Sequence, residues 1–82
     1  MIKQPKLESA IERRNYYQCR MIDNEVNVIY FTQKFEESTP DTQERVDAKS
    51  SIEKAKESIA NDLKLMEAFD ILIDSLEKEL KK

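Results

Sequence analysis

The chain of 82 residues contains no glycine, no histidine, no tryptophan, one cysteine and two prolines. Tight turns and phosphate-binding loops depend on glycine, so its absence argues against a β-meander and against a glycine-rich nucleotide loop. Without histidine the chain lacks the commonest general base and the usual activator of a serine or cysteine nucleophile. We therefore expect no catalytic residues and no enzymatic activity.

The same shortages bear on metals and on cellular location. One cysteine and no histidine leave too few soft ligands for zinc, and the Glu-x-x-His sequence of di-iron bundles is absent. The sequence predicts no metal site and no cofactor. Cys19 cannot form an intrachain disulfide, which favours a reducing, cytoplasmic location. We interpret Cys19 as a half-buried apolar residue rather than a reactive thiol.

Long hydrophobic runs are also missing. No apolar stretch approaches the roughly 20 residues of a membrane span, and the first eight residues run into charge without the apolar core of a signal peptide. The net charge of −3 argues against non-specific DNA binding by the whole chain. The sequence therefore predicts a cytoplasmic protein that does not contact a membrane.

What the sequence does contain is a seven-residue apolar repeat in its second half. The repeat consists of Ile52, Ile59, Met66, Ile73 and Leu80, with Ala48, Ala55, Phe69 and Leu76 between them and Asp62 as the only polar member. A strict seven-residue repeat keeps one side of a helix facing a partner helix. We expect a helix over about 40–81, roughly 60 Å long at 1.5 Å per residue, with Thr39 as N-cap and Pro40 in its first position.

The first half of the chain allows two interpretations. A single helix over about 6–37 places several apolar residues on one face, namely Leu7, Ile11, Tyr17, Met21, Val28, Phe31 and Phe35. The alternative is a β-hairpin over about 16–35, between a short N-terminal helix and a long C-terminal helix, because residues 26–32 are rich in β-branched and aromatic types. We favour the helix, since residues 23–25 lack the glycine of tight hairpin turns and two strands alone are poorly stable.

The preferred fold is all-α, with one domain over residues 1–82. Arm one (6–37), a turn (38–40) and arm two (40–81) form a long antiparallel helical hairpin with a heptad-like seam, in which residue 29 lies near 49 and residue 11 near 67. Each arm then carries apolar surface that the other cannot cover, and exposed apolar patches usually mark interfaces. We expect a homo-oligomer, most simply a dimer that forms a helical bundle. The expected interface residues are Val28, Ile29, Phe31, Phe35, Leu63, Met66, Phe69 and Ile73.

One short stretch has the composition of a binding site. Residues 13–20 interleave basic and aromatic side chains, which can pair with phosphates and stack on bases; the candidates are Arg13, Arg14, Tyr16, Tyr17 and Arg20. The structural alternative is that Tyr17 packs in the seam while the arginines pair with acidic residues.

The leading functional hypothesis is a small helical interaction protein that binds and modulates, or scaffolds, another macromolecule. The lysine-, isoleucine- and glutamate-rich composition is typical of phage or mobile-element accessory proteins. The alternative hypothesis is a protein that binds or sequesters a nucleotide or a short nucleic acid through residues 13–20.

Overall fold

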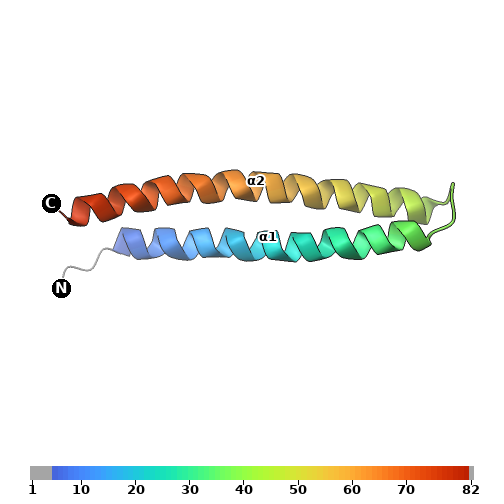
Figure 1. Ribbon diagram of the computed structural model, residues 1–82, viewed down its shortest axis with the longest axis horizontal. Coiled ribbons are helices and arrows are strands. Elements are labelled where there is room, and N and C mark those ends of the chain that lie inside the picture. Colours follow the sequence, from blue (N-terminus) through green and yellow to red (C-terminus); the bar gives the residue numbers. More distant parts are fainter. Residues whose placement is uncertain (1–4, 82) are drawn as a thin grey trace.

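Two long helices make up the protein. The computed structural model describes residues 5–81, in which α1 spans Pro5–Glu37 and α2 spans Gln43–Leu80. The helices pack antiparallel, with the start of α1 beside the end of α2 and the turn at the opposite end (Figure 1). The predicted all-α helical hairpin is confirmed. The β-hairpin alternative for 16–35 is wrong: this segment lies inside α1, where neither glycine nor proline interrupts the helix.

Both helices follow a seven-residue repeat, whose positions are labelled a to g in the usual way. In α2 the a positions are those of the predicted repeat, and the d positions include Asp62. The first half of the chain has a matching repeat, and the sequence analysis placed its six large apolar members on one face without the polar ones. Its a positions are Leu7, Arg14, Met21, Val28 and Phe35, and its d positions are Ala10, Tyr17, Asn24, Phe31 and, directly after α1, Ser38; all of these are buried or half-buried. Ile11, which the sequence placed on this face, is exposed.

The turn is longer than expected, and this shifts the pairing of the two helices. The predicted turn, centred on residue 39, would place Asn24 opposite residue 54. In the structure the Asn24 side-chain amide instead donates a hydrogen bond to the Ser58 hydroxyl at 3.1 Å. The predicted proximity of 29 to 49 and of 11 to 67 is therefore displaced by about one helical turn. The reason is that α2 begins at Gln43 rather than at residue 40.

The N-cap of α2 is Thr42, so the assignment of Thr39 was wrong. Asp41 adopts φ 65°, a left-handed conformation that cannot continue into a right-handed helix and that aspartate tolerates better than most residues. Thr42 then has extended backbone, and its hydroxyl accepts a hydrogen bond from the Arg45 backbone N–H at 3.3 Å. Pro40 consequently lies in the turn and not in the first helical position.

The hairpin has little core of its own. No side chain in residues 5–81 is fully buried, and the buried apolar residues are Ala10, Ala48, Ala55, Met66 and Leu76. Three of these five are alanines, which contribute little hydrophobic area. The shape is correspondingly extended, at 62 × 17 × 13 Å. Its radius of gyration of 18.5 Å compares with about 12 Å for a compact chain of this length.

Candidate functional site

The hairpin presents two broad faces, one on each side of the plane that contains both helices. In an antiparallel pair, the a and e positions of both helices lie toward one face and the d and g positions toward the other. Side-chain contacts agree with this geometry. Arg14, at an a position, bonds to Gln18 and Asp70 at e positions, whereas Arg20 bonds to Ser58 and both occupy g positions.

The face formed by the a and e positions, which we call the apolar face, carries large hydrophobic side chains that are only partly covered. They are Leu7, Ile11, Met21, Val28 and Phe35 from α1, and Ile52, Ile59, Leu63 and Ile73 from α2. Seven of these nine are half-buried, and Ile11 and Leu63 are exposed. The d positions on the opposite side of the seam are covered more fully, and Ala48, Ala55 and Leu76 there are buried. The large side chains of the seam that stay partly uncovered at a positions therefore lie toward the apolar face.

The face formed by the d and g positions, which we call the polar face, contains a cluster at mid-length of the hairpin. Both Arg20 and Asn24 donate hydrogen bonds to the Ser58 hydroxyl, at 3.3 Å and 3.1 Å. Asp62 is only 2% exposed, and its Oδ2 lies 3.3 Å from Nε of Arg20. That oxygen has no hydrogen-bond partner within residues 5–81. The cluster thus holds a buried carboxylate beside a half-exposed arginine.

The candidate binding residues 13–20 divide between seam and surface. Tyr17 lies in the seam and stacks on Phe69, with ring centroids 5.7 Å apart. Arg14 forms an ion pair with Asp70 at 2.6 Å, and Arg20 faces Asp62. The Arg20 guanidinium also lies 5.9 Å from the ring centroids of Tyr16 and Tyr17.

Arg13 and Tyr16, by contrast, are exposed. The stretch does not gather its five candidate side chains into one open site. Cys19, within the same stretch, is exposed as well, so its interpretation as a half-buried residue was wrong.

The expected interface residues occupy three environments. Met66 is buried between the two helices of one chain, and five others are half-buried along the seam, namely Val28, Phe31, Phe35, Phe69 and Ile73. Ile29 and Leu63 are exposed. The structure exposes further large apolar residues that the list of interface residues did not name; these are Ile22, Val26, Tyr30, Leu65 and Ile71. All of them except Ile22 lie in the segments 26–35 and 63–73, which the sequence predicts to carry the interface.

Four of the exposed apolar residues form a stripe on the outer side of α1, away from α2. Ile22, Val26, Ile29 and Tyr30 follow one another at helical spacing, and all four are exposed. This spacing could have been found in the sequence. It was obscured because the same segment was also read as a β-strand.

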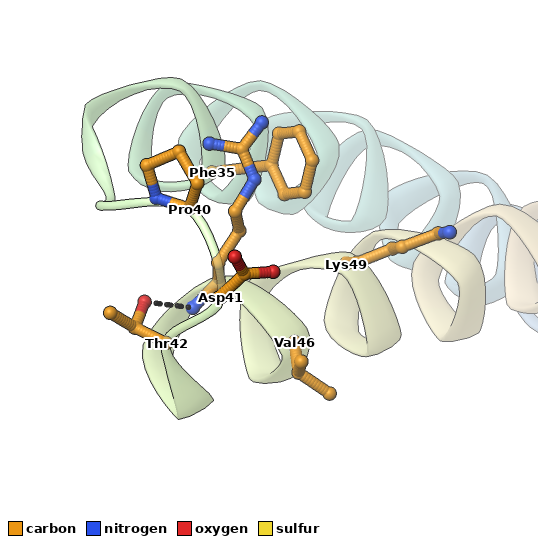
Figure 2. A pocket seen from close by; sticks show the side chains of 7 residues that line it. Phe35, Pro40, Asp41, Thr42, Val46 and Lys49 are labelled. Carbon is orange, nitrogen blue, oxygen red and sulfur yellow. Dashed lines mark hydrogen bonds between the residues drawn. The ribbon is translucent and has the colours of Figure 1, made fainter.

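A shallow, open pocket lies beside the turn (Figure 2). Phe35 and Pro40 line it together with Val46 and Lys49 of α2. The Arg45 guanidinium stacks on the Phe35 ring at 4.0 Å and donates a hydrogen bond to the Ser38 carbonyl at 3.2 Å. Arg45 therefore ties the end of α1 to the start of α2, and its cation is already engaged within the turn.

Other chemical features of the described chain are few. Within residues 5–81 there is no group of three acidic, cysteine or histidine side chains that could hold a metal ion. In the same residues no helix is long and apolar enough to cross a membrane. Beside the outer stripe, the neighbouring Tyr30 raises the pKa of Lys34, chiefly through a hydrogen bond and secondly through charge interaction.

Comparison with known proteins gives no relative from which a function could be transferred. No family model matches the chain, and no curated protein sequence and no solved structure matches it either.

Proposed function

We propose that this protein is a helical interaction module that works as a homo-oligomer, most simply a dimer, and binds or scaffolds another macromolecule. Its cytoplasmic location and its origin as a phage or mobile-element accessory protein are further predictions from composition. Residues 26–35 of one chain are expected to lie near residues 63–73 of another. A four-helix bundle would then supply the core that one hairpin lacks.

The observation that carries the proposal is the imbalance between buried and exposed apolar side chains. Among residues 5–81, only two large apolar side chains, Met66 and Leu76, are buried, whereas eleven are exposed. Burying one large apolar side chain contributes about 1.5–3 kcal/mol, and a small domain is stable by about 5–15 kcal/mol. Covering even a few of the exposed residues is therefore comparable to the whole stability of the domain.

Thermal unfolding at different protein concentrations tests the oligomer. If folding is coupled to association, Tm rises by several degrees over a roughly hundredfold increase in concentration, by mass action. Circular dichroism at each concentration reports the helix content. A cooperative Tm that is independent of concentration would contradict the proposal, because a self-sufficient monomer unfolds at the same temperature whatever its concentration.

The outer stripe of α1 supports the binding of a further macromolecule. Ile22, Val26, Ile29 and Tyr30 face away from α2, and Val26 lies on the side of α1 opposite the seam. We expect Val26→Glu to abolish capture of a protein from the native host while leaving helix content and oligomeric state unchanged. Gln33→Glu is the matched control, since Gln33 is exposed one heptad further along. Equal capture by both variants would remove the stripe from the proposal.

Nucleotide or nucleic-acid binding by residues 13–20 is the alternative, and the contacts give it less support. Arg14 and Arg20 are engaged with Asp70 and Asp62, which leaves Arg13 as the arginine of the stretch without such a contact among the described residues. A ligand that binds only the folded state raises Tm. Increased Tm with nucleoside triphosphates or short oligonucleotides, lost in Arg13→Ala, would favour this alternative.

A further inference from the structure

We propose that the apolar face of one hairpin packs against the same face of a second copy, with the two hairpins antiparallel and Leu63 of both chains at the two-fold axis. This inference rests on the proposed homo-oligomer and adds to it the face, the orientation and the axis of the dimer.

The charges at the e positions of α2, along the apolar face, indicate that a second copy of the same chain covers this face. The e positions of α2 are, in order, Lys49, Lys56, Leu63, Asp70 and Glu77, and all five are exposed. Two bases therefore precede Leu63 and two acids follow it, at equal distances of seven and fourteen residues. When two helices pack antiparallel, side chains at e positions meet e positions of the partner. Pairing about Leu63 brings Lys49 against Glu77 of the second copy, and Lys56 against Asp70, which also pairs with Arg14 of its own chain.

The opposite orientation, with both turns at the same end, gives a poorer match. It places α2 of one copy over α1 of the other, whose e positions are Ile11, Gln18, Glu25 and Thr32. Only Lys56 then meets an acid, Glu25. By two-fold symmetry the antiparallel dimer has four opposite-charge pairs and the other arrangement two. Charge complementarity of this kind selects orientation more than it adds affinity.

The dimensions of the face are sufficient for a stable dimer. The hairpin measures 62 × 17 Å in the plane shown in Figure 1, an area of about 1,050 Å², and a typical stable interface buries about 800 Å² on each partner. The polar face is equally large, and association there would desolvate Arg20, Asn24 and Ser58. Association through the apolar face leaves that cluster in water and covers the Arg14–Asp70 ion pair instead. The charge pattern of the e positions, rather than desolvation, therefore favours the apolar face.

Two neighbouring leucines provide a matched test. Leu63 is 46% exposed and Leu65 is 41% exposed. They lie two residues apart on α2, Leu63 at an e position of the apolar face and Leu65 at a g position of the polar face. In a Cys19→Ser background, Leu63→Cys is expected to form an intermolecular disulfide in mild oxidant, because the two thiols meet at the axis. Leu65→Cys is expected to remain monomeric on a non-reducing gel.

The non-covalent counterpart uses Leu63→Lys and Leu65→Lys. Leu63→Lys places two like charges at the axis and is expected to raise the dimer dissociation constant by about a hundredfold or more. Leu65→Lys should change it by less than about threefold, because exposed sites away from an interface contribute little. Sedimentation equilibrium measures both constants.

The outcomes separate this inference from the proposal on which it rests. A folded monomer of the unmodified protein overturns both. A dimer in which Leu65→Cys forms the disulfide and Leu63→Cys does not overturns only the assigned face. A dimer in which neither thiol forms the disulfide overturns the assigned axis. A disulfide through Leu63→Cys, together with dissociation by Leu63→Lys, supports the inference.

Discussion

The two faces of the hairpin differ in how fully the helices cover the side chains that the same seven-residue repeat supplies. On the polar face six of the ten d positions are buried, among them Ala48, Ala55 and Leu76. On the apolar face the a positions are large, and Val28, Ile52 and Ile59 stay half-exposed. The two helices therefore cover their d-position side chains more fully than their a-position side chains. The a-position side chains are the ones that another surface would cover.

The largest expected effect comes from the seam shared by both faces. Phe69→Asp removes the stacking contact with Tyr17 and places a charge between the helices. We expect a loss of about 3–5 kcal/mol and an unfolded or largely unfolded protein, measured by circular dichroism. Ala68→Asp is the control, because Ala68 is exposed on the next position of α2. If Phe69→Asp folds as well as this control, Phe69 does not lie in the seam.

A smaller effect is expected on the polar face. Arg20→Met leaves the buried Asp62 carboxylate without its cation, which we expect to cost about 1–3 kcal/mol, given that Arg20 is partly exposed. Adding Asp62→Leu should restore the lost stability or exceed it, since replacing a buried ion pair by apolar residues is often stabilising. Chemical denaturation of the two single variants and the double variant measures the coupling. Additive single effects would mean that Arg20 and Asp62 do not interact.

The smallest effect concerns the rim of the apolar face. Lys49→Glu and Glu77→Lys each create two like-charge pairs in the antiparallel dimer, and we expect each to weaken it by about 1 kcal/mol or less at low salt. The double variant Lys49→Glu, Glu77→Lys restores opposite charges and should recover the original dissociation constant. Failure of the double reversal to rescue, with both single variants weakened, would contradict the antiparallel orientation.

The helical hairpin could be predicted from the sequence because the second half of the chain has a clear seven-residue apolar repeat. Apolar residues fill the a positions of α2 from Ile52 to Leu80, so its pattern is visible without the structure. In the first half of the chain the same repeat contains Arg14, Asn24 and, directly after α1, Ser38, and their polar side chains do not mark them as seam residues. Their burial depends on partners in α2, and those partners depend on the register.

The sequence did not determine the register of the hairpin, that is, which residues of α1 lie opposite which residues of α2. Thr39 and Thr42 are equally good N-caps by residue type, and the left-handed backbone of Asp41 decides between them. With the turn placed at 38–40, Asp62 lies opposite residue 16, so its contact with Arg20 could not be foreseen. From the sequence alone, charge reversal at Arg20 is predicted to change stability as little as charge reversal at Arg13, because both are expected at exposed positions. The structure separates the two, because Arg20 faces a buried carboxylate and Arg13 is exposed.

Sedimentation equilibrium of the unmodified protein tests most directly whether the apolar face is covered by a second copy. The chain has a mass of 9.7 kDa. We predict a species of twice that mass at micromolar concentration, with helical circular dichroism under the same conditions. A fully helical, cooperatively folded species of 9.7 kDa would contradict the account, because a single hairpin would then be stable with its large a-position side chains half-exposed.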